Sequence, residues 1–342
     1  MKKIIIAIDT MGGDYGVKAS IPACVRLIKK NSNLKLLLVG NQEQIYTQLK
    51  KFNITKHEQF SVIHTHEEIS MEQSPINAIR NKKNSSMHVA IKLIKEKRAH
   101  ACVSSGNTGA LVAISNFFLK TLPGIERPGI MAVFPTIIGK TRVLDLGASI
   151  TLNARHLFQF SIMGSALIEI LEKKMNPKVG LLNVGIEDIK GNDQIKLASY
   201  KLKQSKIINY IGYVEGNCVY TGRVDLIICD GFTGNIVLKT SEGLAKLILI
   251  KIKESFYKNF FTKLLGIISM PVWLNIKKKM NPIYYNGAVL LGLNGIVIKS
   301  HGNACEKAFE FAIKEAIKEV ENNVIDLLRD RMINYVKQGI LS

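Results

Sequence analysis

Residues 100–119 read HACVSSGNTGALVAISNFFL, and the pattern within them predicts the fold. The apolar run 100–104 is short and continuous, which is typical of a strand buried on both faces of a parallel sheet. Residues 105–109 follow as a polar loop with two glycines, and residues 110–119 have a helical pattern. A strand, a glycine-bearing loop and a helix in this order predict one unit of a doubly wound α/β fold.

The same unit recurs along the chain. Six continuous runs rich in branched residues predict strands at 4–8, 34–39, 100–104, 143–146, 179–184 and 225–229. Helical patterns lie between them at 21–30, 44–51, 86–97 and 158–173. A loop with glycine follows each of the six runs. Ligands of open α/β sheets bind at the carboxyl ends of the strands, so we expect these loops to meet at one ligand-binding edge.

One long segment has a different character. Residues 242–280 are helical, basic and aromatic, with no strand among them. We expect two helices that meet at an apolar tip around residues 266–274. The stretch 304–337 predicts one or two closing amphipathic helices. The length of 342 residues suits one large α/β domain or two ordinary ones.

The composition limits the possible functions. The chain has 47 Lys and Arg against 27 Asp and Glu, a formal net charge of +20, which favours anionic partners. Heavy use of Ile, Lys and Asn throughout offers a compositional explanation for the same charge, and no nucleic-acid recognition motif is present. The five cysteines form no CxxC pair, which favours a reducing cytoplasm. No apolar run approaches the roughly 20 residues of a membrane span, and the run 4–8 is too short for an export signal.

Two loops have the residues of an anion site. In the loop 104–109, free backbone N–H groups at a helix start and small polar side chains would bind an anion; the alternative is an ordinary Ser/Thr N-cap with a glycine turn. The loop 230–235 enters the helical pattern 236–249 in a similar way. The dinucleotide fingerprint, the GxxxxGK[ST] phosphate loop and the GxSxG elbow are all absent. The stretch 64–68, HTHEE, is interpreted as a solvated surface cluster rather than a metal site.

Several motifs together resemble those of a known family. They are Ile6-Ala7-Ile8-Asp9-Thr10-Met11-Gly12-Gly13-Asp14, Ser105-Gly106-Asn107-Thr108-Gly109-Ala110, Leu144-Asp145-Leu146-Gly147-Ala148, Lys190-Gly191-Asn192, Cys229-Asp230-Gly231-Phe232-Thr233-Gly234-Asn235 and Ile298-Lys299-Ser300-His301-Gly302. In this order, from residue 4 to about 312, they resemble the bacterial phosphate acyltransferases, the PlsX family. The chain departs from the usual pattern at five positions: Thr10 and Ser105 stand where the family usually has Ala, Val17 where Pro is common, Ser149 in place of Asn, and Asn286 in place of Gly. None of these changes removes a charged group.

The resemblance implies both a fold and a reaction. The fold is a three-layer α/β/α sandwich with a mainly parallel sheet, similar to phosphotransacetylases and isocitrate dehydrogenases, assembled as a homodimer. We therefore predict a single α/β/α domain over residues 1–342, with residues 242–280 as a protruding amphipathic helical arm within it. The reaction transfers a long-chain fatty acyl group from acyl carrier protein to inorganic phosphate, giving acyl phosphate for phospholipid (phosphatidic acid) synthesis, with no cofactor and no metal. The alternatives are a short-chain phosphate acetyltransferase that uses coenzyme A and a non-catalytic phosphate-binding membrane scaffold.

The resemblance also suggests residue roles. Lys190 would steady phosphate or the transition-state charge, and Asn235 would donate to the developing oxyanion of the thioester. A solvated lysine and a helix cap are the alternative interpretations of these two residues. The expected phosphate- and substrate-binding residues are Asp9, Gly12, Gly13, Asp14, Ser105, Gly106, Asn107, Thr108, Asp145, Asp230, Thr233 and His301.

The arm has a candidate role at a membrane. Its apolar face and lysines suit the interface of an anionic bilayer; the alternative is a helix pair that covers the core or a partner chain. The residues expected to face the membrane are Phe256, Phe260, Phe261, Leu264, Leu265, Ile268 and Trp273. The expected partners are acyl carrier protein, phosphate, a second copy of the chain, the anionic membrane surface and the downstream glycerol-phosphate acyltransferase, with no nucleic acid. We expect a cytoplasmic protein bound peripherally to the inner face of the cell membrane.

Overall fold

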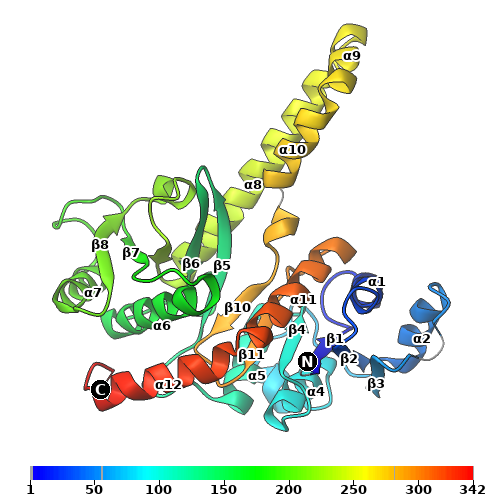
Figure 1. Cartoon of the computed structure of the whole chain (residues 1–342), viewed down its shortest axis with the longest axis horizontal. Coiled ribbons are helices and arrows are strands. Elements are labelled where there is room, and N and C mark those ends of the chain that lie inside the picture. The colour runs from blue at the N-terminus through cyan, green and yellow to red at the C-terminus, as the bar shows by residue number, and fades with distance from the viewer. Residues whose placement is uncertain (1–2, 55–56, 281, 342) are drawn as a thin grey trace.

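The computed structural model describes residues 3–54, 57–280 and 282–341, and for residues 276–280, 282 and 284 it describes no side chain. One 11-stranded sheet runs through the molecule (Figure 1). The strands are β1 (Ile4–Asp9), β2 (Leu34–Gly40), β3 (Phe60–His64), β4 (Ala101–Ser104), β5 (Gly129–Thr136), β6 (Gly139–Leu144), β7 (Lys178–Leu182), β8 (Asn209–Val214), β9 (Leu226–Ile228), β10 (Ala288–Leu291) and β11 (Ile296–Lys299).

Helices cover the sheet and form the arm. They are α1 (Val17–Ile28), α2 (Gln42–Lys50), α3 (Pro75–Asn81), α4 (Ser86–Lys95), α5 (Thr108–Leu119), α6 (Ala154–Glu172), α7 (Asp193–Gln204), α8 (Gly231–Phe256), α9 (Phe260–Ile268), α10 (Met270–Met280), α11 (Glu306–Glu321) and α12 (Val324–Lys337). Two short 3₁₀ helices, η1 (Gly216–Tyr220) and η2 (Pro282–Tyr285), complete the described elements.

The sheet consists of two parallel sets that run in opposite directions. Its strand order is β3-β2-β1-β4-β11-β10-β5-β6-β9-β7-β8. The first five strands are mutually parallel, and so are the last four. Between them, β10 is antiparallel to both β11 and β5, and β5 is antiparallel to β6. The two sets are staggered, because Leu144 near the end of β6 is in register, through Met131 and Val289, with Ile298 near the end of β11. The carboxyl ends of the two sets therefore lie level at the junction although their strands run in opposite directions, and the glycine loops form two groups there rather than one row along a single edge.

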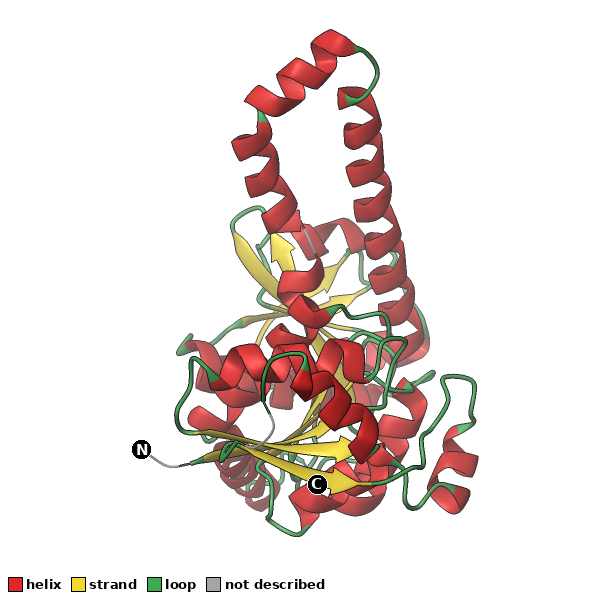
Figure 2. Cartoon of the chain, turned by 90° about the vertical axis from the view of Figure 1, so that its right-hand side faces the viewer, coloured by secondary structure: helices red, strands yellow, loops and turns green. Residues whose placement is uncertain are grey.

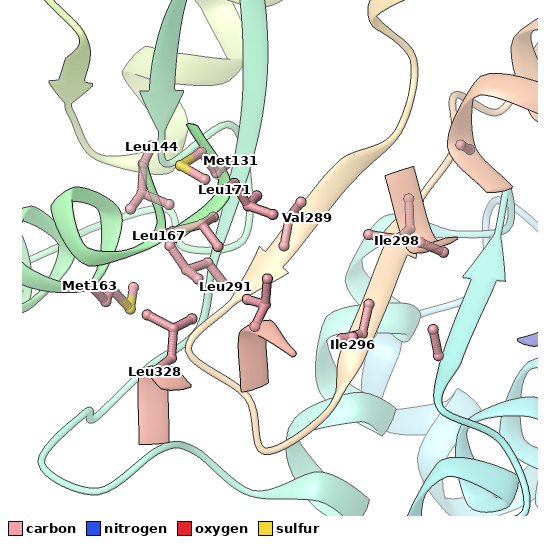
Figure 3. Packing of buried hydrophobic residues seen from close by; sticks show 14 of the residues in the cluster. Met131, Leu144, Met163, Leu167, Leu171, Val289, Leu291, Ile296, Ile298 and Leu328 are labelled. Carbon is pink, nitrogen blue, oxygen red and sulfur yellow. The ribbon is translucent and has the colours of Figure 1, made fainter. Parts of the chain in front are cut away.

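Two apolar clusters fill the two sides of the sheet. Neighbouring strand residues alternate between them, so that Ile6 and Ile8 belong to one cluster and Ala7 belongs to the other, as the two-residue period of a strand requires. The first cluster packs α1, α6, α11 and α12 on the sheet, and the second packs α4 and α5. Figure 3 shows the first cluster at the junction between the two parallel sets of strands, where Leu167 of α6 and Leu328 of α12 meet Leu291 of β10. This confirms the predicted three-layer α/β/α fold.

The predicted elements are present, and further ones join them. All six expected strands exist, although the run 143–146 is the end of a strand that begins at Gly139. The structure adds β3, β5, β8, β10 and β11. Of these, β3 and β8 are the two edge strands, and their residues are mostly only partly buried. Such strands lack the continuous apolar run that marks a buried strand in a sequence.

Helices α8, α9 and α10 protrude from the sheet, and the chain turns at a different place from the one predicted. Figure 2 shows α8 leaving the sheet as a long helix, α9 at the far end and α10 returning. The chain reverses at residues 257–259, so the predicted tip at 266–274 is wrong. Asn259 begins the new helix by accepting a hydrogen bond from the backbone N–H of Thr262 at 2.9 Å. None of the described helices is both long enough and apolar enough to cross a bilayer.

Candidate active site

Asp9 organises the loops at the carboxyl ends of β1, β4 and β11, which we name the first loop group (residues 9–14, 104–107 and 300–303). Its carboxylate is 1% exposed and accepts hydrogen bonds from the hydroxyls of Ser86 and Ser104, both at 2.6 Å, and from the backbone N–H of Gly12 at 3.2 Å. The Ser104 hydroxyl in turn accepts from the N–H of Gly106 at 3.1 Å. The geometry therefore places Asp9 beneath the loops, with its oxygens engaged by the protein.

Glycine brings the three loops of this group into contact. Gly13 has a φ of +78°, and a Cβ at that position would lie 2.6 Å from the carbonyl oxygen of Gly302, so only glycine fits. The Ser105 hydroxyl donates to the carbonyl of Gly12 at 2.7 Å, and the N–H of Asp14 donates to that of Gly302 at 2.9 Å. The structure thus brings the predicted residues of all three loops together.

Asn107 is the N-cap of α5. Its side-chain oxygen accepts from the N–H of Ala110 at 3.0 Å, and its amide donates to the carbonyls of Met71 at 2.8 Å and Gln73 at 3.0 Å. The helix therefore has an asparagine N-cap, whereas the alternative interpretation of this loop expects a serine or threonine. Thr108 begins the helix, and the first backbone N–H groups of a helix have no partner within it. The anion site predicted here would use those N–H groups rather than the Asn107 amide.

Asp145 plays the corresponding part in the second loop group, residues 145–149, 183–190 and 230–235, which follow β6, β7 and β9. Its carboxylate accepts from the backbone N–H groups of Ile130, Gly147, Ala148 and Ser149, at 2.8–3.1 Å. Burial raises the pKa of Asp145 to about 6, although these hydrogen bonds act in the opposite direction. Asp145 therefore fixes the conformation of the loop that follows β6, as Asp9 fixes that of the loop that follows β1.

The start of α8 packs directly on this second group. Asp230 caps the helix by accepting from the N–H of Thr233 at 2.9 Å and from its hydroxyl at 2.8 Å. A Cβ on Gly234 would lie 1.8 Å from the carbonyl oxygen of Asp145, so the close approach of helix and strand end requires glycine. Asn235 lies inside the helix and is exposed. The alternative interpretation of Asn235 as a helix cap is therefore wrong.

Lys190 lies on the neighbouring loop of the same group. Strands β7 and β9 are adjacent and parallel, so the loops that follow them lie at the same edge. The Asn183 amide donates to the carbonyl of Lys190 at 3.2 Å and holds the loop closed. The Lys190 side chain is exposed. Its predicted role with substrate remains a prediction.

Helix α8 connects the two loop groups. Lys239 follows Asn235 by one helical turn, and its ammonium lies 3.0 Å from Nε2 of His301 in the first group. Glu242 contacts both, at 3.0 Å from the Lys239 ammonium and 3.3 Å from the His301 ring. Burial alone would raise the pKa of Glu242, but hydrogen bonds from His301 and Lys239 hold it below its usual value. Asn235, Lys239 and His301 thus form one continuous surface.

Two lysines at this junction were given no role by the sequence analysis. Lys239 could have been found from its i, i+4 spacing to Asn235 on a predicted helix. Lys299 ends β11 and is 8% exposed, and its ammonium donates to the carbonyls of Ser105 at 3.4 Å and of Ser300. Its place in the motif 298–302 was the available signal, but its proximity to Ser105 arises only from the pairing of β11 with β4.

One departure from the family pattern has a clear structural effect. Asn286 donates to the Ser300 hydroxyl and to the carbonyl of Ala308, both at 2.8 Å, and its side-chain oxygen accepts from the N–H of His301 at 2.9 Å. A glycine at this position would make none of these side-chain contacts. Asn286 therefore fixes the backbone that carries His301.

We also searched for candidate sites outside the two loop groups, namely metal-ligating clusters, the pair His64 and His66, and cavities. In the described part of the chain, no three His, Cys, Asp or Glu side chains are grouped so that they could hold a metal ion. His64 and His66 contact each other through their Nε2 atoms at 2.8 Å on the surface. A cavity of about 760 Å³ is lined by residues such as Ile4, Leu34 and Ile296, which begin β1, β2 and β11. It therefore lies at the edge opposite the first loop group.

Solved structures share this fold. The chain superposes on a phosphotransacetylase from Streptococcus pyogenes with a TM-score of 0.62 and 16% identity, over 93% of this chain and 94% of the other. For a branched-chain phosphotransacylase from Enterococcus faecalis the TM-score is 0.59 at 11% identity, over 93% and 99% of the two chains. The fold is therefore that of the phosphotransacetylases, as predicted.

Sequence relatives define the family. A family model described as "Fatty acid synthesis protein" matches residues 4–327. A phosphate acyltransferase from Legionella pneumophila (strain Paris) is 55% identical over all of both chains, and one from Shewanella sp. (strain MR-4) is 46% identical over 97% of each. The chain belongs to this family of phosphate acyltransferases. It is an acyltransferase of fatty acid and phospholipid synthesis, which confirms the predicted activity and does not favour the acetyltransferase or scaffold alternatives.

Proposed function

We propose that this phosphate acyltransferase transfers its long-chain acyl group from acyl carrier protein to inorganic phosphate at the surface where α8 joins the two loop groups. The observation that carries the proposal is the placement of Asn235 and Lys239 one turn apart on α8, with Lys239 against His301. A neutral hydrogen-bond donor and a cationic group are thereby held side by side, as an oxyanion and an attacking phosphate require.

The chemistry needs no nucleophile from the enzyme. A phosphate oxygen attacks the thioester carbonyl carbon, the carbon–sulfur bond breaks, and the carrier thiolate leaves and takes up a proton. The enzyme has to orient phosphate and thioester and to stabilise the oxyanion between them. Asn235 donates to that oxyanion, and Lys190, on the adjacent loop, offsets the charge that develops on phosphate and the leaving thiolate.

The remaining predicted residues divide into two kinds. Asp9, Asp145, Asp230, Thr233 and Asn107 position the loops, because their side chains are hydrogen-bonded within the protein. The phosphate is bordered instead by the residues whose backbone or exposed side chains line the first loop group: Gly12, Gly13, Asp14, Ser105, Gly106, Thr108 and His301.

The acyl chain has an apolar surface beside the reacting groups. Val184, Ile186 and Ile189 precede Lys190 on its loop and are 79%, 67% and 80% exposed. Apolar side chains on a surface loop beside a candidate site are typical of a binding surface for an apolar ligand. They would take up the first methylenes of the acyl chain while the thioester lies at Asn235.

The arm is assigned to the membrane and to a second copy of the chain. The α9 side chains Phe260, Phe261, Leu264, Leu265 and Ile268 are 49–76% exposed, which supports insertion into an anionic lipid surface. Phe256 and Trp273 instead pack on each other inside the arm, with ring centroids 6.4 Å apart. The exposed face of α8 supports a homodimer. Contact with the downstream glycerol-phosphate acyltransferase and a cytoplasmic location at the cell membrane remain predictions.

Incubation of the protein with palmitoyl-carrier and phosphate tests the function. We expect acyl phosphate and free carrier thiol in equal amounts, with much slower turnover of acetyl-coenzyme A. Preference for acetyl-coenzyme A, or release of free fatty acid without acyl phosphate, would contradict the proposal.

A further inference from the structure

We propose that Lys299 and Lys239 hold the phosphate nucleophile, so that the phosphate site of this enzyme is a two-lysine site at the first loop group. This inference rests on the proposed function for the identity of the anion, but the site itself is argued from the contacts of the two lysines. They lie 60 residues apart in the chain and converge through the pairing of β11 with β4 and the docking of α8 on His301.

The Lys299 ammonium is a buried cation without a counter-charge. Among the residues that the structure describes, no carboxylate lies within ion-pair distance of it, and its two hydrogen bonds go to carbonyls. An ammonium has three N–H donors, so one of them has no partner in the described structure. Buried charges in proteins are normally paired, and an anion at this position would supply both the missing acceptor and the missing charge.

The surroundings define what kind of anion fits. Lys299 contacts the carbonyl of Ser105, the residue just before Gly106 and the start of α5, so an anion on its free N–H would lie near backbone N–H groups of that helix. Lys239 of α8 is close enough to act electrostatically on Lys299, and its ammonium lies beside His301 and pairs with Glu242 at 3.0 Å. Two ammonium groups and helix-start N–H groups together suit a small divalent oxyanion better than a carboxylate, because phosphate has several acceptor oxygens for them.

The charges around Lys299 leave its ammonium only partly compensated. Burial is the largest effect and, with the neighbouring Lys239, lowers the pKa of Lys299 to about 8. Asp9 and Asp14 act in the opposite direction and only partly compensate. A bound dianion would favour the charged form of Lys299, so phosphate binding should take up protons near pH 8 and weaken as the pH rises further.

Phosphate binding to the free enzyme and steady-state kinetics test the proposal together. We compare the wild type with two variants, Lys299→Met and Lys239→Gln. Methionine has an unbranched side chain of similar length to lysine, so Lys299→Met removes the buried charge and keeps most of the packing. The control is Lys251→Gln, which breaks a similar exposed Lys–Glu pair on the same helix, with Glu254 at 2.8 Å instead of Glu242 at 3.0 Å. Binding of inorganic phosphate is measured by calorimetry in the absence of acyl donor, and KM is measured separately for phosphate and for acyl-carrier.

We expect Lys299→Met to raise the Kd and KM for phosphate by tenfold or more, as loss of a charged hydrogen bond does, and Lys239→Gln to raise them several-fold. The KM for acyl-carrier should stay within about twofold, and Lys251→Gln should match wild type. Wild-type phosphate affinity in both site variants, or an equal rise of both KM values in Lys299→Met, would overturn the inference. Wild-type enzyme that binds phosphate through these lysines but forms no acyl phosphate would refute the proposed function and leave the two-lysine site intact.

Discussion

Two buried aspartates organise the two loop groups in the same way. Asp9 and Asp145 each end a strand, and each accepts hydrogen bonds from the loop that follows it. The family resemblance predicts that both bind substrate, and it predicts the same for Asn107. A sequence indicates which polar groups lie at strand ends, but it does not indicate whether backbone donors already occupy them. That depends on loop conformation and on neighbours far away in the chain, such as Ser86 for Asp9.

Asn235 is the residue whose removal should affect chemistry most selectively. It is exposed inside α8 and has no capping role, so Asn235→Ala should leave the fold intact. We expect kcat to fall about 10²–10³-fold, the usual cost of losing one oxyanion donor, with little change in the KM for phosphate. Asn116→Ala, at an exposed position of α5, is the control. Near-normal turnover in a folded Asn235→Ala protein would refute the assigned role.

Glu319 should make stability depend on pH. Burial, together with nearby Glu315, raises its pKa to about 8, and Arg142 and Lys318 only partly oppose this. Between pH 4.5 and 8 the folded state keeps a proton that the unfolded state has lost, so the free energy of unfolding should decrease as the pH rises through this window, by up to a few kcal/mol. Glu319→Gln is neutral at every pH and should remove this contribution.

Thermal unfolding of wild type and Glu319→Gln at pH 5 and pH 8.5 measures the effect. Glu319→Gln should have the higher melting temperature at pH 8.5. At pH 5 the melting temperatures of the variant and the wild type should be similar. Glu321→Gln, at an exposed position of the same helix, is the control for loss of a carboxylate. Equal pH dependence in wild type and Glu319→Gln would show that the buried carboxyl does not titrate in this window.

The start of helix α8 belongs to the candidate site and the rest of the helix belongs to the arm. Two glycines of the helix, Gly234 and Gly243, differ accordingly in their surroundings. Gly234 lies against the end of β6, whereas nothing surrounds the position of a Cβ on Gly243 within 4 Å. The helix was predicted from its apolar and polar pattern, which says nothing about how closely it approaches a strand. The close approach of α8 to the end of β6 could not be predicted from the sequence, because it depends on β6 and β9 being parallel neighbours.

The two glycines should respond in opposite directions to the same substitution. Gly234→Ala places a methyl group 1.8 Å from the Asp145 carbonyl, so it should push α8 outward, lower the melting temperature and reduce kcat. Gly243→Ala should raise stability by about 0.5–1 kcal/mol, because alanine is the better helix former at an open position. Chemical denaturation of both variants measures the contrast. A Gly234→Ala protein as stable as Gly243→Ala would contradict the close packing.

The far end of the arm should bind lipid. In liposome flotation with anionic vesicles, we expect the wild type to float and Phe261→Glu/Leu265→Glu to remain in the soluble fraction, because two carboxylates oppose insertion into the apolar layer and are repelled by anionic headgroups. Ile137→Glu changes an isoleucine that is 85% exposed on the β5–β6 turn and should float like wild type. Failure of the wild type to float, or flotation of the double variant, would exclude the tip as a membrane contact.

At the scale of the whole molecule, the sequence predicts the class of fold but not its geometry. Buried strands and their loops follow from local patterns. The reversal between the two parallel sets does not, because it depends on β10, which reaches the sheet after the arm and pairs with β5 and β11. The same long-range pairing brings Lys299 to Ser105. The site therefore depends on contacts between residues nearly 200 positions apart. A local sequence pattern does not predict such contacts.

Association into a homodimer should depend on the exposed face of α8. Leu244, Leu247 and Ile250 recur at helical spacing and are 56%, 51% and 43% exposed, so a partner that covers them would stabilise the assembly by removing apolar surface from water. We expect sedimentation equilibrium without lipid to give twice the chain mass of 38.1 kDa. Leu247→Lys should give a monomer with an unchanged far-UV circular dichroism spectrum, and Tyr200→Lys, which alters a tyrosine 60% exposed on α7, should remain dimeric. A monomeric wild type, or a Leu247→Lys protein that still dimerises, would contradict this assignment of the α8 face.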